Sequence, residues 1–183
     1  MVSIGILGLG NWGSAIAKMW LDEGHKVKGW TIESEVYESI TMDNINHKYL
    51  PKLSLKGMDV SMHIADTLEG VEVVVLAVPS SVILEVVDQV IPHLRPRHVL
   101  LDLAKGLAPD NQMISHAIQE KLIAANMTNP LAVVTGPTIA PEAAAGVMTT
   151  ALVASEDVAV ANKLATTLTT QTFILHPASD PVG

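Results

Sequence analysis

Three glycines near the N-terminus carry the clearest chemical signal in this chain. Gly8, Gly10 and Gly13 have the spacing G-x-G-x-x-G, between an apolar run that predicts a strand and an amphipathic run that predicts a helix. In a dinucleotide-binding turn, the first glycine allows the tight turn, the second lets the backbone approach a pyrophosphate, and the third lets the helix pack on the strand. The helix N-terminus adds unpaired N–H groups and a positive dipole end. The spacing predicts dinucleotide binding, and a turn that serves packing only is the alternative.

An acidic residue follows the second predicted strand. Glu33 lies 20 residues after Gly13, the separation at which a carboxylate accepts a hydrogen bond from the ribose 2′-hydroxyl of NAD. Residues 30–35 contain no arginine that would bind the 2′-phosphate of NADP. The position therefore favours NAD, with NADP as the second choice. Glu35 is an equally near candidate, and for either glutamate a solvated surface position is the alternative.

Two later strand ends carry groups that suit a phosphate-bearing substrate. Lys105 and Gly106 follow one predicted strand, and a lysine there can neutralise a phosphate or polarise a carbonyl. Gly136 and Thr138 follow the next strand, in a turn of small residues that permits close approach of a ligand. Capping a helix is the alternative role for Thr138, and it is compatible with binding.

Strand and helix patterns alternate along the whole chain. Strands are predicted at 2–7, 26–31, 60–64, 71–78, 99–103, 132–135, 151–154 and 172–175, and helices at 12–23, 66–70, 83–91, 114–122 and after 155–157. Asp66 is expected to cap the second helix, and Ser80 or Ser81 the third. The alternation predicts an α/β fold with a Rossmann-type doubly wound, mostly parallel sheet in a single domain, and ligands at the carboxyl ends of the strands.

Composition argues against several classes of function. The chain has 183 residues and no cysteine, and its seven histidines show no metal-ligand spacing, so no metal site is expected. Its formal net charge of −8 argues against nucleic acid as a partner. The longest uncharged apolar stretch, around 73–78, is far below the roughly 20 residues of a membrane span. The start lacks a secretory signal, so a cytoplasmic location is expected.

Five segments occur in one order along the chain. They read Gly-Leu-Gly-Asn-Trp-Gly at 8–13, Asn-Ile-Asn-His-Lys-Tyr-Leu-Pro at 44–51, Ala-Val-Pro-Ser at 77–80, Lys-Gly-Leu at 105–107 and Thr-Gly-Pro-Thr-Ile-Ala-Pro-Glu at 135–142. In this combination they resemble the N-terminal domain of NAD(P)-dependent glycerol-3-phosphate dehydrogenase. The resemblance covers essentially the whole chain.

The resemblance implies both a site and a reaction. Cofactor contacts would come from the glycine turn with Asn11 and Trp12, and from Tyr49, Pro79, Lys105 and Ala140. Contacts to the small phosphate substrate would come from Lys105, Gly136 and Thr138. This oxidoreductase family moves a hydride between nicotinamide C4 and C2 of dihydroxyacetone phosphate or sn-glycerol 3-phosphate, in carbohydrate and glycerophospholipid metabolism. The protein orients the reactants and stabilises charge.

The resemblance also implies parts that this sequence does not contain. Family members continue into a helical second domain, in which a Leu-Lys-Asn segment supplies the lysine that donates and accepts the proton. That domain would start at about 180–183, so 1–183 would be the NAD-binding domain alone, a fragment or truncated member, and inactive by itself. Lys105 is the only catalytic candidate left, and a homodimer is expected once the second domain is present. Thr138 and Pro141 stand where serine and lysine are frequent in the family. Glu33 stands where NADP-preferring members have an arginine-containing turn.

Three alternatives remain open from the sequence. A related β-hydroxyacid-type dehydrogenase is built on the same kind of N-terminal domain. A non-catalytic NAD-sensing module would need only the cofactor site, and a split enzyme would carry the helical domain on another chain. The segment at 44–51 favours the glycerol-3-phosphate enzyme over the first of these.

Overall fold

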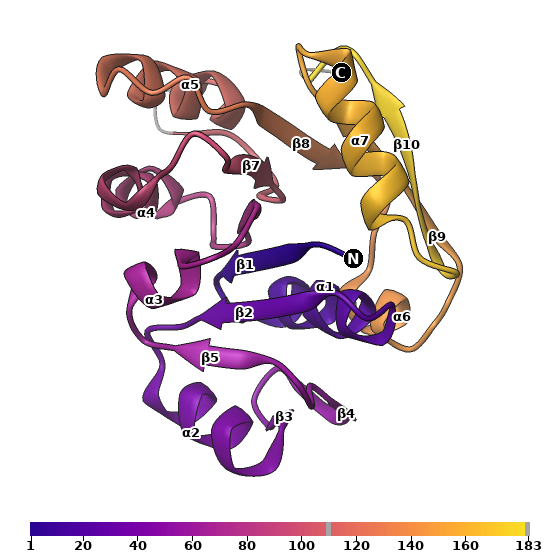
Figure 1. Cartoon of the computed structure of the whole chain (residues 1–183). Helices are drawn as coiled ribbons and strands as arrows, with labels where there is room; N and C mark the ends of the chain where they lie inside the picture. Colours follow the sequence, from indigo (N-terminus) through magenta and orange to yellow (C-terminus); the bar gives the residue numbers. More distant parts are fainter. Residues whose placement is uncertain (109–110, 182–183) are drawn as a thin grey trace.

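The computed structural model describes residues 1–108 and 111–181, and an eight-stranded sheet forms its centre (Figure 1). The strands of this sheet are β1 (Ser3–Leu7), β2 (Lys26–Trp30), β5 (Asp59–Ser61), β6 (Val73–Leu76), β7 (Val99–Asp102), β8 (Leu131–Thr135), β9 (Thr149–Ala154) and β10 (Phe173–Ala178). The helices are α1 (Asn11–Asp22), α2 (Ser34–Asp43), α3 (Ile64–Leu68), α4 (Ile83–Val90), η1 (Ile91–His93), α5 (Ile114–Ala124), α6 (Ala140–Ala144) and α7 (Val158–Leu168). The expected start of a second domain at 180–183 lies partly outside the described residues.

The sheet is doubly wound, and the direction of winding reverses beside its first strand. The strand order is β10-β9-β8-β7-β6-β1-β2-β5, so the chain runs outward from β1 through β2 and β5, then returns to β6 and runs outward the other way. Strand β1 pairs in parallel with both β2 and β6. This arrangement confirms the predicted Rossmann-type fold, and its switch point, between β1 and β6, is where such sheets bind ligands.

One pair of neighbouring strands, β8 and β9, is antiparallel. Thirteen residues, 136–148, connect them, and the only helix among these residues is the five-residue α6, so the chain turns back without a long crossover helix. The chain therefore enters β9 from the edge at which β8 ends, and β10 follows β9 in parallel. The carboxyl ends of β9 and β10 consequently lie away from those of β1, β2, β6, β7 and β8.

Apolar side chains on the two faces of the sheet form separate cores. Ile6 belongs to the core with α1 and α7, whereas the next residue, Leu7, belongs to the core with α3, α4 and α5, because successive side chains of a strand point to opposite faces. Figure 1 shows these two sets of helices on opposite sides of the strands. All four residues of β6 are buried, as its unbroken apolar sequence predicts for a strand covered on both faces.

Several local predictions were wrong or incomplete. Helix α2, the short helix α6 and the two-stranded hairpin of β3 (Ile45–Asn46) and β4 (Leu50–Ser54) were not predicted, and the strand predicted at 60–64 ends at Ser61. The predicted helix caps also fail, since α3, α4 and α6 follow His63, Val82 and Ile139 without any side-chain cap. Asp157, in contrast, does cap α7, because its carboxylate accepts from the Ala159 N–H.

Asp66 and Ser80 to Ser81 fail as caps for a simple reason of position. Helix α3 begins two residues before Asp66, which places that carboxylate inside the first turn, where it accepts from the Ser61 hydroxyl. Helix α4 begins after Val82, so neither serine precedes it directly. Thr138 likewise lies two residues ahead of α6, and its capping role is excluded.

Candidate functional site

A cleft of about 900 Å³ opens at the switch point, along the carboxyl ends of β1, β2, β6 and β7. It brings together most of the residues that the sequence predicted for the site: Gly8, Gly10, Asn11, Trp12, Glu33, Tyr49, Pro79, Lys105, Thr138 and Ala140. Gly13 and Gly136 do not line it. Because the parallel strands end at one edge, segments separated by more than a hundred residues meet there.

The glycine turn has one open position and two crowded ones. A Cβ on Gly8, where φ is +103°, would lie 2.7 Å from the Ala77 carbonyl oxygen, and a Cβ on Gly13 would lie 1.9 Å from the Gly8 carbonyl oxygen. These two glycines therefore pack strand, helix and turn together. A Cβ on Gly10 would meet no atom within 4 Å. The backbone at Gly10 thus faces free space in the cleft, as a turn that receives a pyrophosphate requires.

A buried asparagine supports this turn from below. Asn46, in β3, is fully buried, and its side-chain amide donates to the Leu9 carbonyl oxygen and to the Ser14 hydroxyl, both at 2.9 Å. Its amide oxygen accepts from the Tyr49 N–H at 3.1 Å. Asn46 therefore links the glycine turn and the first turns of α1 to the hairpin that carries Tyr49. Buried polar groups that are satisfied in this way fix local geometry.

The Glu33 carboxylate lies at the rim of the cleft, just after the end of β2. Each oxygen of the Glu33 carboxylate has a partner: Oε1 accepts from the Tyr49 hydroxyl at 2.9 Å, and Oε2 contacts Lys48 Nζ at 2.5 Å. Lys48 Nζ also contacts Glu35 Oε1 at 2.5 Å. The hydrogen bond from Lys48 holds the pKa of Glu33 below its usual value, and the same carboxylate raises the pKa values of Lys48 and Tyr49. Glu33 is thus ionised and engaged at the cleft rim.

Of the three residues predicted to bind the substrate, Lys105 and Thr138 line another part of the cleft. Lys105, which follows β7, donates from Nζ to the Thr138 carbonyl oxygen at 3.1 Å. This contact joins the turn after β7 to the turn after β8, as the sequence predicted from their strand ends. Gly136 instead packs against β9, because a Cβ there would lie 3.1 Å from the Ala151 Cα. Its absence from the cleft lining makes it a packing residue in this arrangement.

The buried carboxyl group of Asp102 comes three residues before Lys105 in the chain. Asp102, the last residue of β7, is 1% exposed, and its Oδ1 accepts from the Ala104 N–H at 2.8 Å. Burial raises the pKa of this carboxyl to about 7, because desolvation disfavours its charged form, and the Ala104 N–H offsets only part of that effect. Asp102 therefore shapes the turn that leads to Lys105 and titrates near neutral pH.

Replacing Asp102 with asparagine should stabilise the chain at alkaline pH. An unfolded aspartate ionises near pH 3.9, so between about pH 4 and 7 the folded chain keeps a proton that the unfolded chain has lost, and stability falls as the pH rises. The asparagine amide oxygen could still accept from Ala104, but the side chain cannot ionise. The stability gain of Asp102→Asn over wild type should grow by about 2–3 kcal/mol from pH 5 to pH 8, measured by urea unfolding. Asp59→Asn, at the exposed sheet edge, is the control; parallel pH profiles of wild type and Asp102→Asn would contradict the assignment.

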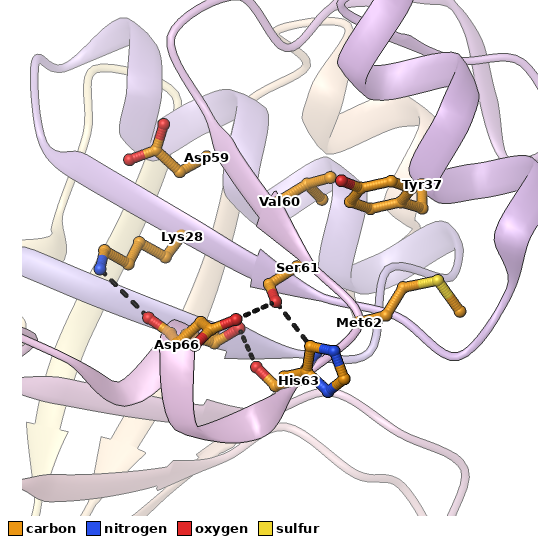
Figure 2. Close-up of a pocket in the computed structure, with 9 residues that line it drawn as sticks. Lys28, Tyr37, Asp59, Val60, Ser61, Met62, His63 and Asp66 are labelled. Carbon is orange, nitrogen blue, oxygen red and sulfur yellow. Dashed lines mark hydrogen bonds between the residues drawn. The ribbon is translucent and has the colours of Figure 1, made fainter.

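A second hollow, of about 450 Å³, lies at the outer edge of the sheet beside α2 and α3 (Figure 2). Three of its lining residues form hydrogen bonds: Lys28 Nζ donates to the Asp66 and Glu69 carbonyl oxygens, and the Ser61 hydroxyl donates to the Asp66 carboxylate. These contacts attach α3 to β2 and β5. Within 1–108 and 111–181 no three His, Asp or Glu side chains gather as a metal site. The Lys28, Ser61 and Asp66 side chains are therefore explained by packing of the sheet edge.

Asn46 and Lys48 support the cleft through their contacts, and sequence reasoning assigned a role to neither. Both stand inside the segment 44–51, but their contacts depend on how the hairpin folds back onto the end of β2. The sequence signal near them is the helical spacing of Val36 and Ile40, followed by Asn44. In the structure, Asn44 ends α2 with a φ of 56°. Among the described residues, no helix has the length and hydropathy needed to cross a membrane.

Comparison with known proteins identifies the family of this chain. Residues 3–161 match the family described as NAD-dependent glycerol-3-phosphate dehydrogenase N-terminus. Glycerol-3-phosphate dehydrogenase [NAD(P)+] of Anaeromyxobacter dehalogenans is 33% identical over 179 residues, which is 97% of this chain and 54% of that protein. The corresponding protein of Syntrophotalea carbinolica is 32% identical over 183 residues, 100% of this chain and 55% of that protein.

The structural comparison gives the same result. A crystal structure of glycerol-3-phosphate dehydrogenase from Coxiella burnetii superposes with a TM-score of 0.88 at 28% identity, covering 98% of this chain and 54% of that one. The chain thus spans about half the length of the relatives that it matches. It belongs to the family of NAD-dependent glycerol-3-phosphate dehydrogenase N-terminal domains.

Proposed function

We propose that the cleft binds NAD, and NADP as a second cofactor, for an enzyme that interconverts dihydroxyacetone phosphate and sn-glycerol 3-phosphate. The observation that carries the proposal is the turn at Gly10, whose backbone faces open space at the switch point beside the N-terminus of α1. A pyrophosphate placed there would accept from helix N–H groups and lie at the positive end of the helix dipole. Gly10 and Asn11 would hold the phosphates.

The rest of the cleft suits the remaining parts of a dinucleotide. Exposed apolar side chains, Ile32 and Val82, line it and offer contact surface for a purine base. Glu33 and Tyr49 would contact the adenosine ribose, whose 2′-hydroxyl can donate to the carboxylate. Trp12, Pro79 and Ala140 would contact the remainder of the cofactor.

The substrate would lie beside Lys105 and Thr138. The Lys105 ammonium supplies a positive charge for a phosphate or for a polarised carbonyl, and Gly136 supports the turn that presents Thr138. The cofactor, when bound, supplies or removes a hydride at nicotinamide C4. The residues of this chain orient both molecules. We extend the proposal to a cytoplasmic enzyme that is a homodimer when a helical second domain is present.

Fluorescence titration of the chain with NADH tests the proposal. Trp12 and Trp30 both line the cleft, so bound NADH should quench their emission in a saturable way. Trp12→Phe and Trp30→Phe should each remove part of the quenching, whereas Trp20, which is buried against Leu168, should contribute little. Failure of millimolar NADH to bind, by fluorescence and by calorimetry, would contradict the proposal.

A further inference from the structure

Lys48 lies beside Glu33, the carboxylate that the proposed function assigns to the adenosine ribose. It belongs to the turn between β3 and β4, and its ammonium lies 2.5 Å from the Glu33 carboxylate that lines the cleft. Its side chain is 44% exposed. Lys48 is 15 residues from Glu33 in the sequence, and only the fold of the hairpin brings the two side chains together.

The Lys48 ammonium is held by two carboxylates and is still able to serve a third acceptor. It contacts Glu33 Oε2 and Glu35 Oε1, which account for two of its three N–H donors. Exposed ion pairs of this kind are weak, because water competes for both partners and the side chains lose freedom when they pair. A more highly charged acceptor could therefore draw the ammonium away from Glu35 or Glu33.

The local charge makes the lysine decisive for a phosphorylated ribose. Glu33 and Glu35 carry two negative charges and Lys48 one positive charge, so this part of the rim is negative by one unit. A 2′-phosphate brings a further charge close to −2 at neutral pH. Without Lys48 it would face two carboxylates, a like-charge arrangement that disfavours binding. With Lys48 it gains a charge-assisted hydrogen bond.

We propose that Lys48 determines whether this chain accepts NADPH, by binding the 2′-phosphate while Glu33 serves the 2′-hydroxyl of NADH. This inference rests on the proposed function, since it assigns a specificity-determining residue to the same cleft. It predicts opposite responses of the two cofactors to one substitution. Loss of the ammonium removes the partner of the 2′-phosphate, and at the same time frees Glu33 Oε2 for the 2′-hydroxyl.

Titration of the chain with NADH and NADPH, for wild type and Lys48→Met, tests the proposal. The Kd for NADPH should rise about tenfold or more, the effect of losing one charge-assisted hydrogen bond, while the Kd for NADH stays constant or falls by up to about threefold. Lys48→Arg should keep NADPH binding. Lys52→Met removes an exposed lysine from the same hairpin and should leave both Kd values unchanged.

The fragments adenosine 2′,5′-bisphosphate and adenosine 5′-monophosphate differ only in the 2′-phosphate and isolate its contribution. Lys48→Met should weaken only the first of them. Equal weakening of NADH and NADPH, with a normal circular dichroism spectrum, would mean that Lys48 only holds the Tyr49 turn, and would overturn the proposal. So would unchanged NADPH binding. If the wild type binds neither dinucleotide, the proposed function fails as well. If the wild type binds them and Lys48→Met gives one of the two contradicting results, only the Lys48 proposal fails.

Discussion

Residues 1–183 alone should bind NADH yet oxidise it at the background rate when dihydroxyacetone phosphate is supplied. Within residues 1–108 and 111–181, Lys105 is the candidate acid at the proposed substrate position, and its ammonium donates to the Thr138 carbonyl oxygen. The resemblance places the acid/base lysine in a second domain, and the relatives are nearly twice as long as this chain. Lost acid–base catalysis costs about 10²–10⁴-fold, and lost substrate positioning adds to this.

The measurement is the decrease in NADH absorbance with saturating dihydroxyacetone phosphate, using a full-length relative such as the Syntrophotalea carbinolica protein as the positive control. Saturable NADH binding without turnover is the expected result. The same result is compatible with an NAD-sensing module, so the assay is repeated with a helical second domain added as a separate chain. Turnover that appears only then supports the dehydrogenase. Robust turnover by 1–183 alone would show that a group in this chain, with Lys105 the first candidate, already acts as the acid.

The positions of the main strands in the sequence could be predicted because each has a local pattern. The apolar sequence of β6 and the glycine turn after β1 are strong signals within a few residues, and both appear where expected. Helix α2 was missed because its composition is polar and only Val36 and Ile40 are buried. The reversal at β9 was missed because the direction of a strand is set by how its connecting segment folds, and strand patterns alone do not contain that information.

Some residues of the candidate site could likewise be predicted from the sequence, and others could not. Glu33, Lys105 and Thr138 could be predicted, because residues that follow parallel strands meet at one edge wherever those strands lie in the sequence. Asn46 and Lys48 could not, because their contacts depend on the return of a short hairpin toward the end of β2. Gly136 is predicted to contact the substrate from its turn and from the family resemblance. In the structure its lack of a side chain makes room for β9, which the sequence did not indicate.

Gly10→Val should abolish dinucleotide binding while the chain stays folded. The φ and ψ angles of Gly10, −72° and −164°, are accessible to valine, and a Cβ there meets nothing within 4 Å, so the fold has no reason to change. The added side chain would instead fill the space in which the pyrophosphate must approach the backbone. We expect the Kd for NADH to rise by at least about a hundredfold, or about 2.7 kcal/mol, with a thermal midpoint within a few degrees of wild type.

Gly13→Ala is the matched control, because it adds a smaller side chain to the same turn at a crowded position. Its Cβ would lie 1.9 Å from the Gly8 carbonyl oxygen, so this variant should lose folded stability, by about 3 kcal/mol or more in urea unfolding. The two substitutions thus distinguish an effect on ligand binding from an effect on packing. The fold should tolerate the larger side chain at Gly10 and should not tolerate the smaller one at Gly13. If Gly10→Val bound NADH as wild type does, the open turn would be a packing feature, and the dinucleotide proposal would lose the observation on which it depends.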